Sequence, residues 1–415
     1  MKKNINLVKG THDIYGADME KFEFIIENFY SVCKNFNFKS IQTPIIEQQE
    51  LFSRTVGEQT DIVSKEMYSF LDKGDINICL RPEATSGLAR FAATNYQSGL
   101  MKLITHGPMF RRERPQKGRY RQFHQINIET IGEKNPYIDF ELILVAKLLF
   151  DELGINKNSY KLLINSLGSK EDQYNYSNLL KKYLSTFKNK LSETSILRLD
   201  KNPLRILDSK DAEDAEILKN APQISDHLSS DSKNYFEQVK TLLNDNEIIF
   251  FEDSKLVRGL DYYSHTAFEF QTIEDKRQNA ILAGGRYDNL ISMISSRDIP
   301  GVGWAAGIER LMDLVIIKEE KVNSKIKILF AVQDGDYLNN NTVLRQIYKS
   351  KFNHEVRINK NIKKLFSYAD KNNFNIILLI GEEEKKTKKI ILKDLKNKSQ
   401  KSFEISKFDL INEIR

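Results

Sequence analysis

The segment Phe110–Gly132 reads FRRERPQKGRYRQFHQINIETIG, and its two halves differ in character. The first half is a basic loop around Gly118, with the cationic residues Arg111, Arg112, Arg114, Lys117, Arg119 and Arg121. The second half alternates as a β-strand does, so that Gln125, Asn127 and Glu129 share one face. The segment therefore predicts a strand that presents a row of polar side chains beside an arginine-rich loop.

An arginine-rich loop and a polar strand face have two different chemical uses. Guanidinium groups bind phosphate oxygens bidentately, whereas a carboxamide or a carboxylate binds a cationic or hydrogen-bonding small molecule. The segment therefore favours adjacent sites for a polyphosphate and a small polar ligand. A solvated basic hairpin on a half-exposed sheet has the same pattern, and these residues do not distinguish the two interpretations.

The composition is that of a soluble globular protein. The chain has 415 residues, of which 40% are hydrophobic and 29% are charged, and this length predicts two or three domains. No apolar run approaches the roughly 20 residues of a membrane span, and the N-terminus lacks the pattern of a secretory signal. Cys33 and Cys79 have no metal-ligand spacing, so we expect buried thiols in a reducing, cytoplasmic compartment. A net charge of +6 permits nucleic-acid binding without requiring it.

The residues before the basic loop alternate between helical and extended patterns. Met19–Phe36 has apolar residues at helical spacing, and the following short β-branched run is interrupted by Pro44, which favours an edge strand or a subunit boundary. Ile76–Arg81 is a predicted strand, and Thr85–Gln97 is a predicted helix. Glu83 lies at the turn between them, where side chains commonly face a cleft.

The residues after the loop predict a sheet with a helical insertion. Ile138–Leu153 has the pattern of an apolar helix, and residues 166–245 are helical, rich in lysine and serine and poor in strand patterns. Sheet patterning returns at Ile248–Phe251. Two glycine-rich segments follow, Ile281–Leu290 and Pro300–Leu314, and each predicts a strand that leads into a polar or helical stretch.

A charged stretch, residues 318–325, is the expected linker to a second domain. Residues 326–415 predict a small α/β domain, with strands at Ile326–Val332, Asn375–Ile380 and Lys389–Leu392. The expected fold class is therefore mixed α/β. It has a core over residues 1–320 with an antiparallel sheet and flanking helices, the insertion within that core, and a separate C-terminal domain.

Several long motifs together resemble the histidyl-tRNA synthetases, a family of class II aminoacyl-tRNA synthetases. The segments that carry the resemblance are Thr55–Phe70, Leu80–Thr85, Phe110–Glu129, Asn202–Asp214, Leu256–Tyr263, Ala283–Leu290 and Pro300–Leu311. The histidine assignment rests on LVRGLDYY and AGGRYDNL (Leu256–Tyr263 and Ala283–Leu290). The resemblance implies a class II core, a C-terminal anticodon-binding domain and a homodimer formed through the Pro44 region.

The resemblance also implies a reaction, that of a histidine–tRNA ligase. Such an enzyme activates L-histidine with ATP, with Mg²⁺ on the phosphates and no metal centre of the protein's own, and then transfers histidine to the terminal adenosine of tRNA(His). Arg111 and Arg258 are implied as catalytic cations near the α-phosphate, and Arg310 as a ligand of the γ-phosphate. The implied ATP-binding residues are Arg111, Glu113, Arg119, Arg258 and Arg310.

The implied histidine pocket combines hydrogen-bonding groups with aromatic walls. Its residues are Glu83, Thr85, Gln125, Glu129, Tyr262, Tyr263 and Tyr287. Without LVRGLD before them, Tyr262 and Tyr263 would be interpreted as aromatics that pack on the sheet. His124 falls on the opposite strand face from Gln125, so we expect it to be packed. The residues implied at the tRNA acceptor end are Arg114, Gln116 and Lys117.

Two other functions share parts of this pattern. One is a regulatory subunit of ATP phosphoribosyltransferase, a paralogue that shares the core and does not aminoacylate. The presence of Arg111, Arg258 and Arg310, and of a C-terminal domain, favours the synthetase. The other is a nucleic-acid-binding protein without enzymatic activity, which would leave GLDYY, GGRYD and Glu83 without a purpose.

Overall fold

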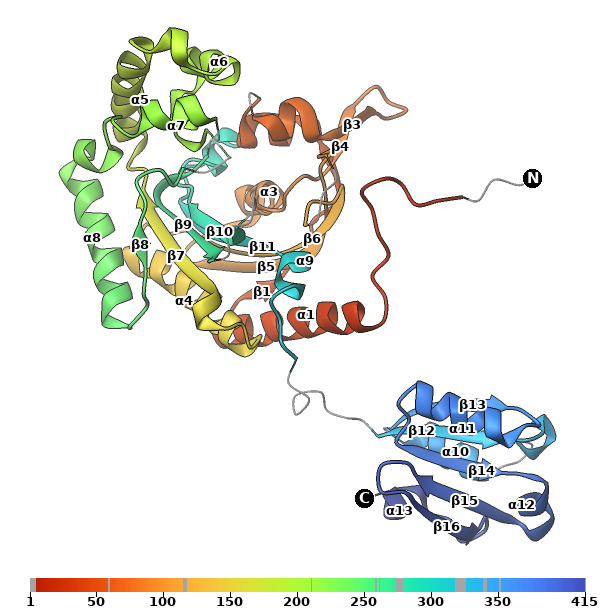
Figure 1. Ribbon diagram of the computed structural model, residues 1–415. Coiled ribbons are helices and arrows are strands. Elements are labelled where there is room, and N and C mark those ends of the chain that lie inside the picture. The colour runs from red at the N-terminus through yellow and green to blue at the C-terminus, as the bar shows by residue number, and fades with distance from the viewer. Residues whose placement is uncertain are drawn as a thin grey trace. The chain divides into compact units, whose positions relative to one another are not determined.

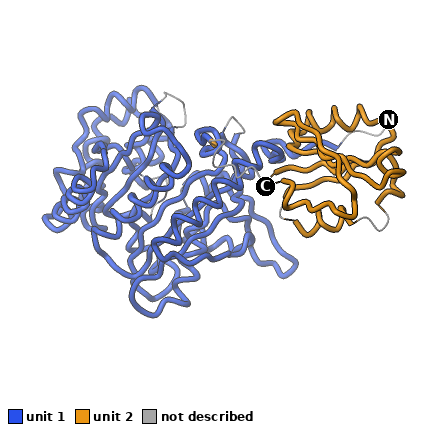
Figure 2. Tube along the Cα trace, turned by 90° about the horizontal axis from the view of Figure 1, so that it is seen from below, with its two compact units in different colours: residues 1–316 blue, residues 317–415 orange. Residues whose placement is uncertain are grey.

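The chain folds into two compact units, Met1–Ile316 and Ile317–Arg415 (Figure 2). The computed structural model describes residues 5–58, 60–114, 118–209, 211–257, 260, 262–273, 279–317, 326–338, 342–350 and 352–414. The expected linker, residues 318–325, lies outside these described residues.

An eight-stranded sheet forms the centre of the first unit (Figure 1). In spatial order its strands are β1 (Lys39–Ser40), β5 (Met101–Phe110), β6 (Gln122–Ile131), β11 (Gly301–Gly307), β10 (Ala280–Arg286), β9 (Ser264–Thr272), β7 (Tyr160–Ser166) and β8 (Phe251–Glu252). The strands from β5 to β7 pair antiparallel, whereas the short outer strands β1 and β8 run parallel to their neighbours. The predicted antiparallel sheet is confirmed.

Two helices pack on one face of this sheet, and the opposite face is left partly open for a site. Outside the insertion, the helices of the first unit are α1 (Ala17–Asn35), α2 (Gln49–Phe52), α3 (Thr85–Asn95), α4 (Pro136–Glu152) and α9 (Ile308–Met312). Trp304 of β11 is buried against the pair α1 and α4, and its Nε1–H donates to the Leu142 carbonyl of α4 at 2.9 Å. Ile128 of β6 pairs with Trp304 and shares that face. Because side chains alternate along a strand, Gln125, Asn127 and Glu129 face the other way.

A second, smaller sheet follows the Pro44 segment. Its strands, in the order β2-β4-β3, are β2 (Ile46–Gln48), β4 (Asn77–Leu80) and β3 (Tyr68–Leu71). Pro44 lies in the irregular stretch between β1 and β2, as expected for a residue that cannot donate to a strand ladder. Two π-helical turns, Ser53–Gly57 and Ile62–Glu66, connect β2 and α2 to β3.

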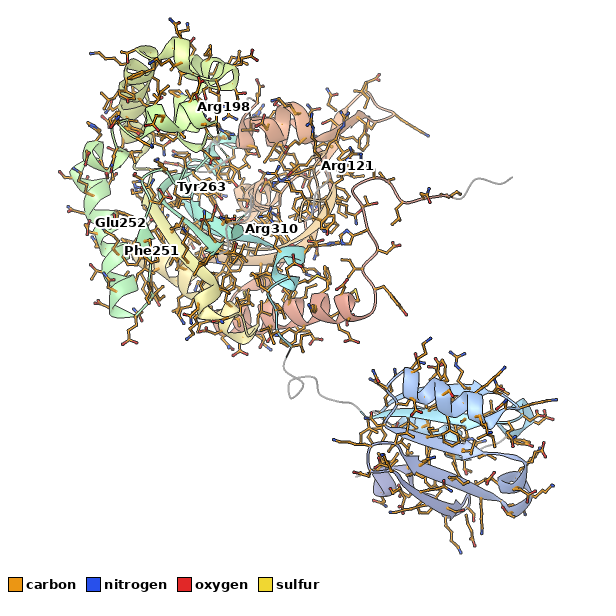
Figure 3. All side chains as sticks on the ribbon, in the orientation of Figure 1. Arg121, Arg198, Phe251, Glu252, Tyr263 and Arg310 are labelled. Carbon is orange, nitrogen blue, oxygen red and sulfur yellow. The ribbon has the colours of Figure 1, made fainter. Side chains whose placement is uncertain are left out.

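The segment between β7 and β8 is helical, as its composition predicted (Figure 1, yellow-green to green). Its α-helices are α5 (Lys170–Ser185), α6 (Glu193–Lys201), α7 (Ala212–Leu218) and α8 (Ser230–Asp245), with short turns η4 (Lys188–Lys190), η5 (Pro203–Asp208) and η6 (Ile224–His227). Arg198 of α6, labelled in Figure 3, forms an ion pair of 3.4 Å with Asp61, which lies just before the π-helical turn Ile62–Glu66. Because Met1–Ile316 is one compact unit, residues 166–245 as a separate domain stay a prediction.

Two aspartates organise this helical segment through serine side chains. Asp172 accepts five hydrogen bonds of 2.5–3.1 Å from Ser169, Ser229 and Ser232, and so joins the starts of α5 and α8. Asp214 is bound in the same way, by donors from Ser192, Ser195 and Ser209. These carboxylates are buried, and each takes several donors from the helix ends that it connects.

The second unit is a five-stranded sheet with helices on both faces. In the order β13-β12-β14-β15-β16, its strands are β13 (Asn353–Ile358), β12 (Lys327–Val332), β14 (Ile376–Ile380), β15 (Lys389–Asp394) and β16 (Ser399–Glu404). Its helices are α10 (Thr342–Lys349), α11 (Ile362–Lys371), α12 (Glu382–Thr387) and α13 (Leu410–Ile414). The three predicted strands are β12, β14 and β15. The sequence analysis did not predict β13 and β16, which are edge strands with mostly polar residues.

No helix among the described residues is long and apolar enough to cross a membrane. Cys33 and Cys79 are buried and unpaired, as predicted. Burial raises the pKa of both thiols, so they are poor nucleophiles.

Candidate active site

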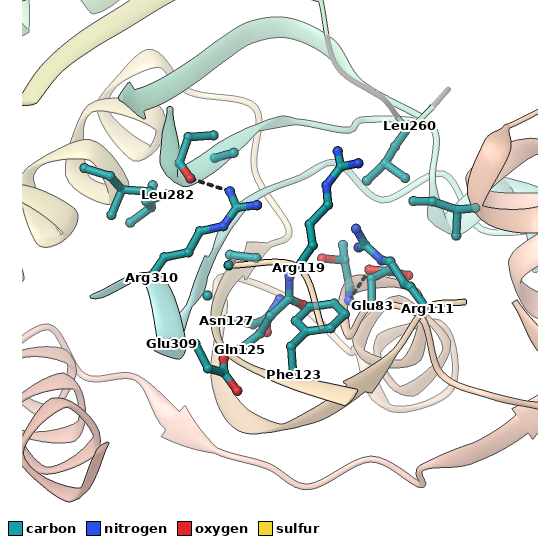
Figure 4. Close-up of a pocket in the computed structure, with 18 of the residues that line it drawn as sticks. Glu83, Arg111, Arg119, Phe123, Gln125, Asn127, Leu260, Leu282, Glu309 and Arg310 are labelled. Carbon is teal, nitrogen blue, oxygen red and sulfur yellow. Dashed lines mark hydrogen bonds between the residues drawn. The ribbon is translucent and has the colours of Figure 1, made fainter. Parts of the chain in front are cut away.

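A cavity of about 270 Å³ opens on the face of the large sheet that α1 and α4 leave uncovered (Figure 4). Four strands, β6, β9, β10 and β11, contribute to its wall, together with α9 and the loops before α3 and β9. The predicted site residues that line it are Glu83, Thr85, Arg111, Glu113, Arg119, Gln125, Tyr262, Tyr263 and Arg310. Predicted site residues up to 227 positions apart in the sequence, Glu83 and Arg310, therefore meet in one pocket.

Strand β6 supplies the polar wall that its alternation predicted. Phe123, Gln125 and Asn127 all face the cavity. The Gln125 Oε1 atom and both side-chain polar atoms of Asn127 are buried and have no hydrogen-bond partner among the described residues. Buried polar atoms nearly always have a partner in a folded protein. These groups are therefore placed to bind a ligand.

A glycine of β11, the strand that pairs with β6, leaves room for the Glu129 side chain. Gly303 of β11 pairs with Glu129, and a Cβ atom at this glycine would lie 1.6 Å from Glu129 Oε2. No side chain fits there, so only glycine allows the carboxylate to occupy the space over the sheet. This close approach explains the glycine in the strand interior.

Glu129 lies behind the lining residues and is fully buried. It accepts a hydrogen bond of 2.6 Å from Thr85 Oγ1 and another from Tyr287 Oη. Burial raises its pKa to about 8, although both hydrogen bonds act in the opposite direction. Of the predicted histidine-binding residues, Glu129 and Tyr287 thus form the back of the pocket, with Thr85 between Glu129 and the cavity.

Glu83 is held at the start of α3, the strand-to-helix turn that the sequence predicted. Its carboxylate accepts from the backbone N–H groups of Thr85 at 2.6 Å and Ser86 at 2.9 Å. These bonds satisfy orphan donors of the first helical turn and fix the carboxylate at the pocket wall, where the residue is 4% exposed.

Tyr262 and Tyr263 form an aromatic wall rather than packing only within the sheet. Their ring centroids are 4.7 Å apart, and Tyr262 also contacts Tyr287 edge-on at 5.7 Å. Both residues are buried yet line the cavity. Burial raises the pKa of Tyr262 well above its ordinary value, so its hydroxyl stays protonated and can donate.

Three arginines give the other part of the pocket a positive character. Arg111 donates Nε–H to the Pro82 carbonyl at 2.9 Å and lies over the Phe123 ring. Arg119 pairs with Glu113 at 2.8 Å, and Arg310 donates to the Ala280 carbonyl at 2.5 Å. Burial, with Arg119 and Arg111 nearby, lowers the pKa of Arg310. Cations gathered in this way repel one another, and an anionic ligand would relieve the repulsion.

Several predicted site residues lie elsewhere or outside the description. Arg114 is exposed and does not line the cavity. Arg258, Gln116 and Lys117 lie outside the described residues, so their implied roles stay predictions. Among the described residues, no group of three His, Cys, Asp or Glu side chains is arranged to hold a metal ion.

The sequence analysis missed some lining residues. Asn127 lies between two predicted ligands in the alternation of β6, and that spacing was the available signal. Glu269 lines the cavity from β9, between the buried Phe268 and Phe270, so the same alternation could have identified it. Leu282 of β10 had no such signal, because its segment is continuously apolar or glycine.

Comparison with known proteins identifies the family to which this site belongs. Residues 10–311 match the family described as histidyl-tRNA synthetase, and residues 337–415 match an anticodon-binding domain. The chain belongs to the histidyl-tRNA synthetase family. It is therefore an aminoacyl-tRNA synthetase, and its second unit contains the anticodon-binding domain.

Individual relatives agree with this assignment over almost their whole length. The histidine–tRNA ligase of Wolbachia pipientis subsp. Culex pipiens is 42% identical over 394 residues, which cover 95% of this chain and 96% of the relative. That of Hydrogenovibrio crunogenus is 40% identical over 407 residues, or 96% and 95% of the two chains. The solved apo histidyl-tRNA synthetase of S. aureus has a TM-score of 0.79 and 29% identity, and covers 97% of this chain and 98% of that one.

Proposed function

We propose that this chain is a histidine–tRNA ligase that uses the described pocket for both steps of its reaction. It activates L-histidine with ATP, giving histidyl-adenylate and pyrophosphate, and transfers histidine to the 3′-terminal adenosine of tRNA(His). One observation carries the proposal: a single cavity joins unpartnered amide groups of β6 to a cluster of arginines. This is the arrangement that an amino acid and a polyphosphate require side by side.

The amino acid occupies the part of the pocket between α3 and the tyrosines. Glu83 is a fixed carboxylate suited to an ammonium group, and Gln125 offers an unpartnered carbonyl oxygen beside it. Glu129 lies deeper, behind Thr85, and with Tyr287 and Thr85 as its donors it forms the back of the imidazole site. Tyr262 and Tyr263 enclose the side chain. Such a site rejects apolar analogues, because they would leave its buried polar groups unpaired.

The arginine part of the pocket binds ATP. The carboxylate of histidine attacks the α-phosphorus, and the bond from that phosphorus to the bridging oxygen of pyrophosphate breaks. Negative charge shifts toward the leaving group, so fixed cations stabilise the transition state more than the ground state. Arg111 and Arg258 act at the α-phosphate, and Arg310 holds the γ-phosphate end.

Magnesium fits the chemistry of the same region. Glu113 and Glu269 line the cavity, and carboxylate oxygens are the ligands that Mg²⁺ prefers. These side chains would hold the ion together with the phosphate oxygens of ATP. When bound, Mg²⁺ neutralises phosphate charge.

The second step requires the acceptor end of tRNA to reach the same pocket. A ribose hydroxyl of the terminal adenosine attacks the activated carbonyl, forming an ester and releasing AMP. The basic loop between Arg111 and Arg121 is the contact for the acceptor end, with Arg114, Gln116 and Lys117 as phosphate or base ligands. The anticodon-binding domain supplies a second point of contact with tRNA(His).

The working form is a homodimer in the cytoplasm. The small sheet presents apolar side chains to solvent on one face: Ile46 is 53% exposed, and Phe70 is 46% exposed. Exposed apolar groups gathered beside the Pro44 segment favour an interface. In the double variant Ile46→Asp/Phe70→Asp, sedimentation at micromolar concentration should change from a dimer to a species of the chain mass, 48.2 kDa. A wild-type chain that already sediments at that mass would contradict the dimer.

ATP–pyrophosphate exchange with each of the twenty amino acids, without tRNA, tests the reaction. Exchange with histidine and with no other amino acid is the expected result. A folded chain that binds histidine and shows no exchange would instead support the regulatory paralogue of ATP phosphoribosyltransferase.

A matched pair of arginine variants tests the pocket. Arg111→Ala should lower the rate of exchange about 10²–10³-fold, the size typical for loss of one preorganised charge donor. Arg112→Ala is the control, because Arg112 is exposed and does not line the cavity. Equal loss in both variants would contradict the role of Arg111.

A further inference from the structure

His124 belongs to the central motif, yet its side chain lies on the face away from the pocket. Its neighbours there are helices α1 and α9: the ring meets Phe22 of α1 edge-on at 5.0 Å between centroids. The sequence pattern predicted only that this residue would be packed. Its contacts with α9 are more specific than packing requires.

Glu309 of α9 binds His124 through three hydrogen bonds. The backbone N–H of His124 donates to both carboxylate oxygens at 3.0 Å, and imidazole Nδ1 is 2.8 Å from Oε1. Because a carboxylate only accepts, Nδ1 carries the proton in this pair. The side chains are 19% and 8% exposed, so water competes little for these bonds.

The His124–Glu309 pair, called the clamp below, lies next to residues that line the cavity. Glu309 is next to Arg310 on α9, and the two side chains leave the helix on opposite sides (Figure 4). His124 is next to Gln125 and Phe123, which line the cavity, and Phe123 supports the Arg111 guanidinium. The clamp therefore joins β6, whose Phe123 supports Arg111, to α9, which carries Arg310.

We infer that His124 and Glu309 are positioning residues that hold Arg310 at a fixed distance from Arg111 and thereby set the affinity for the ATP phosphates. The inference rests on the proposed function for its kinetic test. His124 does not line the cavity. Glu309 does line it, but its carboxylate is bound by His124, so both residues act through the elements that they join. Placement errors of about 1 Å at a reacting group are enough to slow a reaction severely.

Two substitutions of similar size separate this role from packing. Asn places its amide nitrogen near the position of imidazole Nδ1, whereas Gln places it near Nε2. His124→Asn should therefore keep the KM for ATP within about twofold, and His124→Gln should raise it about tenfold, as for loss of one hydrogen bond to a charged group. The KM for histidine should stay within about twofold in both variants.

His106 supplies a matched control on the neighbouring strand. It lies on the same sheet face, and its Nδ1 is 2.9 Å from Tyr30 Oη of α1 rather than from α9. His106→Gln should leave the KM for ATP unchanged, even if the melting temperature falls. Equal values of this KM in His124→Asn and His124→Gln, or parallel rises in the KM for ATP and for histidine, would overturn the inference.

Calorimetric titration with ATP keeps the test independent of turnover. It should show the same tenfold difference in Kd between the Gln and Asn variants of His124. If the wild-type chain showed no exchange with histidine, the proposed function would fail, and this Kd would still decide whether the clamp sets the affinity for ATP. Unchanged Kd values in His124→Gln would overturn the inference whatever the exchange assay gave.

Discussion

Two buried carboxylates, Glu129 in the pocket and Asp172 in the helical insertion, have opposite acid–base behaviour. Glu129 is fully buried and receives two hydrogen bonds, and burial raises its pKa to about 8. Asp172 is 5% exposed. Burial acts to raise its pKa too, but the hydrogen bonds from Ser232, Ser169 and Ser229 outweigh that effect and lower it to about 2.

The two differ in how completely they are desolvated and in the number of donors that the protein itself supplies. Five donors make the charge of Asp172 a structural element that holds two helix starts together. Glu129 has two, and its neighbours Gln125 and Asn127 keep atoms without a partner among the described residues. Polar groups that the fold satisfies stabilise it, whereas polar groups that the fold leaves short of partners await a ligand. Each of the following experiments probes that distinction.

The largest effect should come from Asp172→Asn. This change removes the negative charge and places an amide NH2 group, which can only donate, against serine groups that also donate. The free energy of unfolding should fall by about 3 kcal/mol, since several charge-assisted hydrogen bonds are lost. Denaturant titration measures this, and the KM for histidine should change less than threefold. Asp231→Asn is the control, because Asp231 is exposed in the first turn of α8 and should change stability by about 0.5 kcal/mol or less.

Next in size is the effect of Glu129→Ala on histidine binding. The KM for histidine should rise about a hundredfold, which corresponds to about 2.7 kcal/mol, because the pocket loses the acceptor at its back. Steady-state exchange at varied histidine measures it. Glu133→Ala, at an exposed position just beyond the same strand, should have no effect on this KM. An unchanged KM in Glu129→Ala would remove Glu129 from the site.

The pH dependence of stability should differ in sign between the two carboxylates. Between about pH 4.5 and 8, folded Glu129 holds a proton that the unfolded chain has lost, so its contribution to stability is lost as pH rises. Asp172 contributes above about pH 4, and its contribution is lost as pH falls toward 2. From pH 6 to 8, the free energy of unfolding should therefore fall by about 2 kcal/mol more in wild type than in Glu129→Gln. Parallel pH profiles would contradict the raised pKa.

The smallest effect should come from removing one donor of Asp172. Ser232→Ala leaves the other four donors in place and should cost about 1 kcal/mol of stability. Ser230→Ala, at an exposed position in the same helical turn, should be near neutral. If Ser232→Ala destabilised the chain as much as Asp172→Asn, the carboxylate would depend on a single donor rather than on the shared network.

Much of the pocket was predictable because it follows from local rules. Alternation along β6 placed Gln125 and Glu129 on one face and His124 on the other, and the strand-to-helix turn placed Glu83 at a cleft. The C-terminal unit was harder. Its strands β12 and β14 are continuous apolar runs because both faces are covered, whereas the edge strands β13 and β16 are half-exposed and read as polar loops.

The sequence by itself determined the strand and helix periodicities, the charged loop, and, through long motifs, the family. These depend on neighbours in the chain, so their information is local. Only the tertiary structure decided that Glu129 lies behind Thr85, opposite Gly303, which leaves room for its carboxylate. It also decided that Glu309 binds His124 on the sheet face away from the pocket. Those relations join residues up to 185 positions apart. They exist because antiparallel pairing of β6 with β11 brings the two segments into register, and no local pattern encodes that register.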